Sequence, residues 1–198
     1  PLLSVWDSHH LRVTILVERS KMGASAMEEN LGWRVASPDD SAVDSAIQAG
    51  LLPGHDSGSR PMHVMLPLDE YPNLNTGVSG PLWTGHIGDP DVMASMSEAA
   101  AEEICKVDDP EMGPKEVRRA KQAVRRICDE GKAIHGSHLV ITDALPSFVG
   151  EGDPPSPSKM AEALREGGFC AEVSRYAEPS FRTDAPWSAV LQAFRGLS

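Results

Sequence analysis

One segment restricts the fold of this chain more than any other: PKEVRRAKQAVRRICDEGK, residues 114–132. Its apolar residues recur every three or four positions, which is the spacing of one face of an α-helix. Proline is tolerated at the first position of a helix and glycine is favoured where a helix ends, so Pro114 and Gly131 mark the two ends. One face carries Val117, Ala120, Val124, Ile127 and Cys128, and the other carries Arg118, Arg119, Lys121, Arg125 and Arg126. We therefore predict a helix with one buried face and one basic face.

Strands and helices alternate along the rest of the chain. Every second residue from Leu11 to Val17 is apolar, and this period of two predicts a strand with one face in a core. Further strands are predicted at residues 61–68 and 137–145, with two short ones within residues 169–187, and helices at residues 22–31, 42–49, 89–100, 159–168 and 187–194. This order predicts an α/β (α+β) fold. We expect a mixed sheet with flanking helices in a substrate-binding domain over residues 1–149, then a winged-helix-like segment over residues 150–198.

The composition narrows the classes of function. Among 198 residues, 29 acidic side chains outnumber 18 basic ones, giving a formal net charge of -11. Such a chain repels a polyanion on average, so any contact with nucleic acid must come from a local basic patch. The three cysteines show no CxxC spacing, which excludes a disulfide framework or a cysteine zinc site and suits a reducing compartment. No apolar run is long enough to span a membrane and no leader precedes Leu2, so we expect a soluble, cytoplasmic protein that does not contact membranes.

The stretch GPLWTGHIGDP, residues 80–90, has two possible interpretations. A glycine-rich turn can cradle a phosphate, but this one has neither the Lys-Ser/Thr of a P-loop nor the G-x-G-x-x-G of a dinucleotide fold. Packing is the favoured interpretation, with Gly80 and Gly85 allowing close backbone approach. Burial of Leu82 and Trp83 would then stabilise the fold by about 2–3 kcal/mol per side chain.

Candidate metal and catalytic residues are sparse. His135 and His138 could share a metal ion only on a helix, whereas Gly136 and the following apolar run predict a turn that enters a strand, and His9-His10 is placed at a strand entrance. There is no G-x-S-x-G motif, and acidic pairs such as Asp39-Asp40 are typical of a solvated surface. We predict no metal site and no catalytic residue in this chain.

The basic residues form the remaining candidate site. A C-terminal set consists of Lys159, Arg165, Arg175 and Arg182, and the long helix contributes Arg118 and Arg125. A helix followed by a two-stranded wing can place arginines along one edge, where a phosphate backbone can lie. The alternative is that these cations pair with the abundant carboxylates. For the long helix the two interpretations are equally supported.

Four stretches together resemble one family: PLLSVWDSHHLRVTI, SGPLWTGHIGDPDVM, PSPSKMAEALREGGFCAEVSRY and FRTDAP. They are similar to the C-terminal half of the S-adenosylmethionine-dependent tRNA (guanine(26)-N(2))-dimethyltransferases, which modify the guanosine between the D and anticodon stems. The resemblance implies a Rossmann-like catalytic domain that precedes this half and binds the methyl donor. It also implies that this chain contacts tRNA.

Some family features have no counterpart here. Neither the donor-binding glycine loop nor the Asp-Pro-Phe motif of the catalytic domain is present, so we expect no cofactor in this chain and S-adenosylmethionine only in the parent enzyme. Many relatives carry a CxxC…CxxC zinc knuckle, but residues 33–79 contain no cysteine, so we expect no zinc. The lysine of the family's K-T-D-A-P is Arg182 here, which keeps the charge. The histidine of its S-R-T-H-F is absent from residues 174–178.

The resemblance implies a tRNA-binding domain of a methyltransferase, with tRNA and the N-terminal methyltransferase domain of the same protein as partners. Because the chain starts at Pro1 and lacks the catalytic half, we expect that it is part of a longer enzyme and does not act alone. Two alternatives stay open. One is an acidic protein-interaction module that does not bind RNA, and the other is a complete small enzyme with its own donor pocket.

Overall fold

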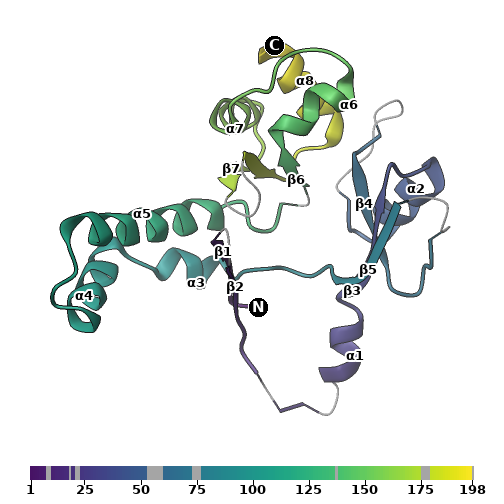
Figure 1. The fold of residues 1–198 in the computed structure, drawn as a ribbon. Helices are drawn as coiled ribbons and strands as arrows, with labels where there is room; N and C mark the ends of the chain where they lie inside the picture. Colours follow the sequence, from purple (N-terminus) through teal and green to yellow (C-terminus); the bar gives the residue numbers. More distant parts are fainter. Residues whose placement is uncertain are drawn as a thin grey trace.

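The computed structural model describes residues 1–7, 10–17, 19–20, 23–52, 60–72, 77–136, 138–174 and 179–197. Within these ranges helices alternate with three small sheets, and every strand pair is antiparallel. The predicted α/β (α+β) class is therefore confirmed, but the mixed sheet is wrong, because no described strand runs parallel to its neighbour. Figure 1 shows two compact parts, a helical arm that projects from them, and a two-stranded ribbon at the N-terminus.

The first compact part is a three-stranded sheet covered on one face by a helix, and its strand order is β4-β3-β5. Val35 and Val64 lie directly opposite each other on the covered face and pack against Val43 and Ala46 of the helix. Asp39 begins the helix by accepting a hydrogen bond from the Ala42 amide at 2.9 Å. The elements are β3 (Leu31–Ala36), α2 (Asp40–Gln48), β4 (His63–Pro67) and β5 (Gly77–Trp83), preceded by the short helix α1 (Gly23–Glu28).

The second compact part is a three-stranded sheet in the order β6-β8-β7 packed against helices. Its core is centred on Phe181 and Phe194, which are fully buried, and includes Leu145 as well as Leu164. Residues on both sides of position 150 share this core; the division after residue 149 stays a prediction. The elements are β6 (His138–Ile141), the 3-10 turn η1 (Thr142–Ala144), α6 (Leu145–Val149), α7 (Pro157–Glu166), β7 (Ala171–Ser174), β8 (Ser180–Thr183) and α8 (Trp187–Leu197). The expected helix followed by a hairpin is present, while the winged-helix likeness stays a prediction.

The arm consists of three helices, of which the longest has the bounds predicted from its pattern. α4 packs along α5, and α3 packs against the carboxyl end of α5. There the thiol of Cys128 donates to the carbonyl oxygens of Met93 and Met96, at 3.2 and 3.3 Å. The elements are α3 (Pro90–Ser95), α4 (Glu98–Asp108) and α5 (Pro114–Gly131).

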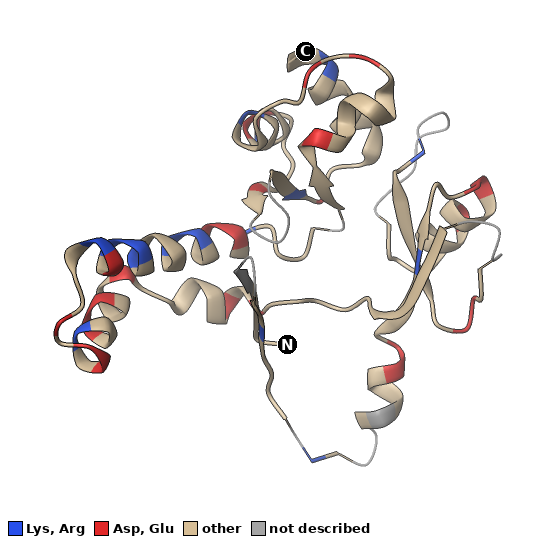
Figure 2. Ribbon diagram, viewed as in Figure 1, with Lys and Arg blue, Asp and Glu red and all other residues tan. Residues whose placement is uncertain are grey.

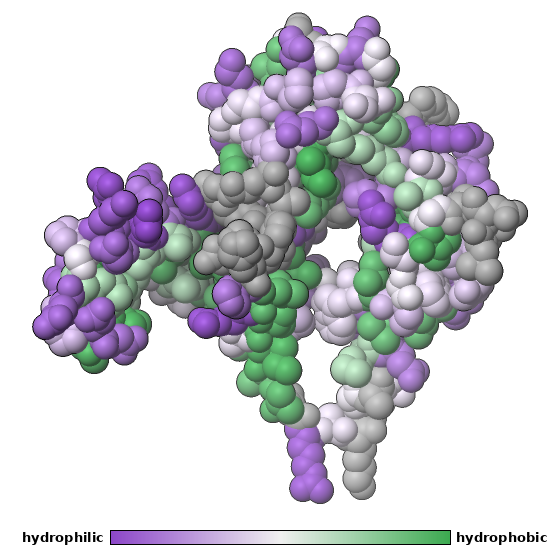
Figure 3. All heavy atoms as spheres, in the orientation of Figure 1, coloured by the Kyte–Doolittle hydropathy of each residue, from purple (hydrophilic) through white to green (hydrophobic). Residues whose placement is uncertain are grey.

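The N-terminal ribbon differs from its prediction. β1 (Leu3–Asp7) and β2 (His10–Thr14) form an isolated antiparallel pair. The strand predicted over residues 11–17 is present only as far as Thr14. No layer of the described residues covers it: Leu11 is 68% exposed, and Val17, three residues beyond the strand, is 78% exposed. Figure 3 shows the ribbon as a column of hydrophobic atoms below the arm. Alternating apolar residues predict a face that prefers burial, and the described residues provide nothing to bury it.

A buried ion pair joins the arm to the second compact part. Glu130, in the last turn of α5, accepts a hydrogen bond from Arg182 Nε of β8 at 3.0 Å, and their side chains are only 5% and 9% exposed. The same carboxylate oxygen accepts the hydroxyl of Ser174 on β7. One carboxylate therefore connects the helix to two neighbouring strands.

Removing either partner should destabilise the chain strongly, because it breaks an ion pair whose two side chains are only 5% and 9% exposed. We expect Arg182→Ala and Glu130→Ala each to lower the free energy of unfolding by about 3–5 kcal/mol, measured by urea denaturation. Arg195→Ala is the matched control, since Arg195 and Glu151 form an exposed pair at 3.9 Å worth about 0–1 kcal/mol. Equal losses in Arg182→Ala and Arg195→Ala would contradict the structural role of the buried pair.

Two histidines meet where the compact parts touch. His63 of β4 and His138 of β6 line a small cavity that Trp187 of α8 also borders. Burial lowers the pKa of His63 to about 4, with a further contribution from the Arg34 guanidinium. Burial also lowers the pKa of His138 to about 4, with a smaller contribution from His63. Both imidazoles are therefore neutral in the folded chain at neutral pH.

Acid should weaken the fold over a defined range of pH. In the unfolded chain these histidines take up protons near pH 6.5, whereas the folded chain resists protonation down to about pH 4. The free energy of unfolding should therefore fall as the pH drops from about 6.5 to 4. We expect His63→Gln and His138→Gln to flatten this dependence in urea titrations, and His10→Gln, on the exposed strand β2, to leave it unchanged. An unaltered slope in both junction variants would contradict this assignment.

Candidate nucleic-acid interface

The basic face of α5 is the largest group of exposed cations that the described residues bring together. Successive helical residues turn by about 100°, so its four arginines fall within about a third of the helix circumference, over about 12 Å of its length. All four are exposed and none forms an ion pair with a described residue. They are Arg118, Arg119, Arg125 and Arg126. In Figure 2 they form much of the blue colouring along α5; we call them the α5 arginine face.

The neighbouring helix α4 neutralises the cation that lies off this face. Lys121 Nζ binds Glu102 at 2.8 Å, and Lys106 Nζ binds the same carboxylate at 2.8 Å. Hydrogen bonds from Lys106 and Lys121 lower the pKa of Glu102 to about 2, and the carboxylate in turn raises the pKa of Lys121. Glu102 therefore stays ionised at neutral pH and cancels charge on the α4 side of the arm. The uncompensated charge of α5 remains on its arginine face.

A second group of charges lies at the carboxyl end of α5. Lys132 pairs with Asp129 at 2.9 Å, and this hydrogen bond raises the pKa of Lys132, which also senses the charges of Glu172 and Arg165. Arg165 of α7 donates to the carbonyl oxygen of Ala171 at 2.7 Å and lies 3.3 Å from Glu172. Cations of α5 and α7 therefore approach each other here, but carboxylates compensate them.

The predicted C-terminal set does not form one edge of free cations. Arg182 is a correction: it is buried against Glu130 and cannot reach a phosphate in this structure. Arg165 is held by Ala171 and Glu172, as described above. Lys159 is exposed near the start of α7, without an ion pair to any described residue. Arg175 lies outside the described residues.

The long helix contributes more than the sequence analysis selected. Arg118 and Arg125 were chosen as candidate RNA contacts, and both lie exposed on the α5 arginine face. Arg119 and Arg126, which the helical spacing placed on the basic face but which were not selected as RNA contacts, are exposed on the same face. Of the two interpretations left open for this helix, carboxylate pairing holds for Lys121 but for none of the four arginines.

The structure also corrects the expected burial of the GPLWTGHIGDP stretch. Trp83 and Leu82 were expected to be buried, but they are 37% and 40% exposed. The indole N–H of Trp83 donates to the carbonyl oxygen of His86 at 3.0 Å. Gly85 allows this arrangement, since a Cβ there would lie 2.8 Å from the Trp83 ring. The glycine is explained by close approach, as predicted, but the aromatic ring stays at the surface.

The histidines of the candidate metal pair are separated. His138 is buried beside Trp187, with 5.7 Å between ring centroids, whereas His135 is exposed and stacks on His86 at 3.7 Å. Among the described residues, no group of three or more His, Cys, Asp or Glu side chains could hold a metal ion. In that same part of the chain, no helix is long and apolar enough to cross a membrane.

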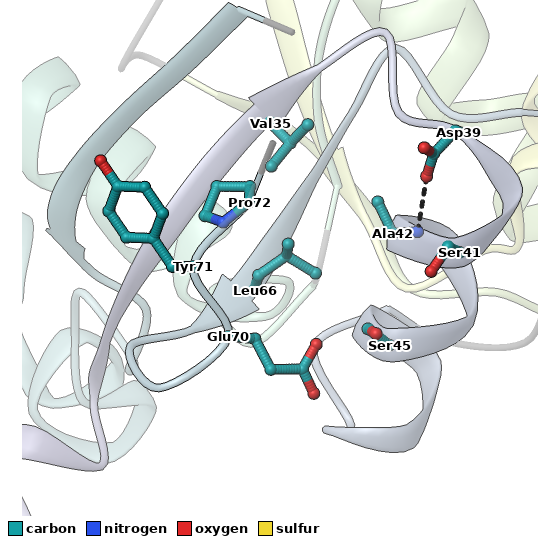
Figure 4. A pocket seen from close by; sticks show the side chains of 9 residues that line it. All are labelled: Val35, Asp39, Ser41, Ala42, Ser45, Leu66, Glu70, Tyr71 and Pro72. Carbon is teal, nitrogen blue, oxygen red and sulfur yellow. Dashed lines mark hydrogen bonds between the residues drawn. The ribbon is translucent and has the colours of Figure 1, made fainter. Parts of the chain in front are cut away.

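A groove of about 340 Å³ lies between α2 and the sheet of the first compact part. Figure 4 shows Glu70 pointing toward Ser45 of α2, while Asp39 is engaged in capping that helix. Val35 and Leu66 form the apolar floor. The carboxylates at its edge disfavour a phosphate, so this groove does not extend the basic interface.

Comparison with known proteins places the chain in context. A family model described as N2,N2-dimethylguanosine tRNA methyltransferase matches residues 1–195. The tRNA (guanine(26)-N(2))-dimethyltransferase of Aeropyrum pernix is 27% identical over 98% of this chain and 42% of that protein. The enzyme of the same name from Pyrobaculum aerophilum is 25% identical over 98% of this chain and 40% of that protein. The chain thus spans about two fifths of the length of these curated relatives.

A solved structure shares the fold. The complex of Trm1 from Pyrococcus horikoshii with S-adenosyl-L-methionine superposes with a TM-score of 0.66, at 16% sequence identity. The match covers 97% of this chain and 42% of that one.

Proposed function

Because this chain belongs to the N2,N2-dimethylguanosine tRNA methyltransferase family, as its resemblance implied, we propose that it is the tRNA-binding part of such an enzyme. In this proposal the chain holds tRNA in the cytoplasm while a separate catalytic part transfers methyl groups from S-adenosylmethionine to N2 of a guanine. In this division the catalytic residues and the donor pocket belong to that separate part. The length of this chain, about two fifths of that of its relatives, is consistent with this division of labour.

The α5 arginine face is the observation that carries this proposal. Four uncompensated guanidinium groups within about 12 Å of helix can neutralise successive phosphates, and each displaces condensed counterions from the RNA. Arginine also binds phosphate through paired hydrogen bonds. The net charge of -11 opposes binding at long range, but at about 0.15 M salt the screening length is about 8 Å, so the local arginines dominate at contact.

Removing two arginines from this face should weaken tRNA binding in a way that salt reveals. We expect Arg118→Ala/Arg125→Ala to lower the affinity of the chain for tRNA and to reduce the slope of log affinity against log salt by about 2. Filter binding across a range of salt concentrations measures both quantities. The matched control is Arg60→Ala/Arg195→Ala, which removes the same charge from exposed arginines already paired with Asp40 and Glu151.

Each outcome of this comparison is decisive. A reduced slope in the α5 variant alone supports the proposal. Equal effects in both variants would show that only total charge matters and would contradict a site on α5. No tRNA retention by the unaltered chain, even at low salt, would favour the alternative of an acidic protein-interaction module.

The N-terminal ribbon supports the second proposed partner, the catalytic part of the same enzyme. Exposed hydrophobic side chains along a strand with an unpaired edge, and along the chain that follows it, are typical of a surface that another layer covers. The exposed residues are Leu11, Val13, Ile15, Leu16 and Val17. Because the relatives are more than twice as long as this chain, their additional length can supply that layer.

Charged substitutions on the ribbon should weaken its contact with the catalytic part without affecting the folding of this chain. We expect Leu11→Asp/Val13→Asp to leave the thermal midpoint of this chain nearly unchanged, because both side chains are already exposed. In the complete enzyme the same substitutions should strongly reduce methyl transfer to tRNA. Val107→Asp, on the exposed face of α4, is the control and should preserve activity. Full activity of the ribbon variant would contradict this docking role.

A further inference from the structure

Three exposed aromatic side chains gather where the linker from β5 meets the end of α5. The rings of His86 and His135 are stacked, with 3.7 Å between centroids and an interplanar angle of 21°. Trp83 is joined to His86 through its indole N–H. All three are exposed, and Trp83 is 37% exposed. We call these residues the aromatic platform.

The backbone around the platform holds it in place. Trp83 ends β5, whose pairing with β3 aligns it opposite Leu31. His86 follows after a tight turn at Gly85, where a Cβ would collide with the indole. The linker then packs on the end of the arm, since a Cβ at Gly88 would meet Ile134 at 3.2 Å. The exposed rings are therefore fixed by the fold rather than free to move with a loose loop.

The surroundings of His86 favour its neutral form. Burial lowers the pKa of His86, and the neighbouring His135 lowers it further. A neutral imidazole can lie against a second ring without the repulsion that two imidazolium ions would suffer. Because the facing sides of the two rings cover each other, the exposed area of the pair belongs to its outer faces and edges.

The platform adjoins the basic helix. His135 follows Lys132 by three residues, and three residues of chain reach at most about 11 Å. Lys132 itself directly follows Gly131, the last residue of α5. An RNA strand that follows α5 toward its carboxyl end would therefore meet the aromatic rings next.

We propose that the aromatic platform stacks an unpaired base of the RNA whose backbone lies along the α5 arginine face. This inference rests on the proposed function and specifies its substrate: RNA with at least one unstacked or extruded nucleotide. Proteins that bind single-stranded RNA combine a cationic track for the backbone with aromatic rings for the bases, and histidine is among the side chains that stack in this way. The GPLWTGHIGDP stretch thereby has a role that buried packing does not supply.

Stacking and charge neutralisation leave different signatures, which makes the proposal testable. We expect His135→Ala and His86→Ala each to weaken binding of RNA with unpaired bases by about 5- to 150-fold, the range for losing one stacked base. The slope against log salt should stay unchanged, because no phosphate contact is lost. His135→Tyr should retain most of the affinity, since tyrosine also stacks. Binding of a fully paired RNA duplex with the same number of phosphates should be unaffected.

The results also distinguish this inference from the proposed function. If Arg118→Ala/Arg125→Ala reduces the salt slope while His86→Ala and His135→Ala change nothing, the platform is wrong and the tRNA-binding function stands. Equal losses on duplex and unpaired RNA, or equal losses in His135→Tyr and His135→Ala, would also overturn the platform. If Arg118→Ala/Arg125→Ala changes neither the affinity for tRNA nor the salt slope, the proposed tRNA-binding function is contradicted, and the platform that rests on it is contradicted as well. Thermal midpoints of all variants exclude unfolding as the cause.

Discussion

The buried contact between Glu130 and Arg182 joins the helical arm to the second compact part. It connects the last turn of α5 to the middle strand of the β6-β8-β7 sheet, and Ser174 adds a second strand to the same carboxylate. Two charges removed from water stabilise a structure only when they stay together and are hydrogen-bonded. The direction in which the arm projects therefore depends on this one carboxylate. The arginine of the family motif FRTDAP, Arg182, thus contributes to the architecture by anchoring α5.

The chain can be acidic overall and still have a basic helix face, because ion pairs within the arm form on the α4 side of α5 and not on its arginine face. Glu102 of α4 pairs with two lysines, while the arginines on the opposite side of α5 form no ion pair with a described residue. Since salt screens the distant carboxylates more than a contact between guanidinium and phosphate, the average charge of the chain says little about its surface. The aromatic platform lies just beyond the carboxyl end of α5, so exposed aromatic rings follow the arginines along this surface.

Local patterns predicted some elements, such as α5, β4 and α7, but they missed β1, β3 and β5 and predicted one helix at residues 89–100 where the structure has α3 and α4. Long-range partners explain the errors of burial. The bounds of α5 followed from proline, glycine and helical spacing, which act within a few residues. The pairing of Arg182 with a carboxylate 52 positions earlier leaves no local signature, so its burial could not be foreseen. The exposure of Trp83 and of β2 could not be foreseen for the same reason. Apolar character predicts that a side chain prefers burial, but whether a covering layer exists depends on residues elsewhere, and the described residues do not provide one.

The cavity beside His138 and Trp187 has a consequence for how the two compact parts are held together. Nε2 of His138 and Nε1 of Trp187 are buried there without a hydrogen-bond partner, in a space of about 10 Å³. A polar atom that gave up water on folding and gained nothing in return weakens the surface that buries it. The unpartnered atoms thus weaken the contact between the two compact parts, each of which keeps its own core.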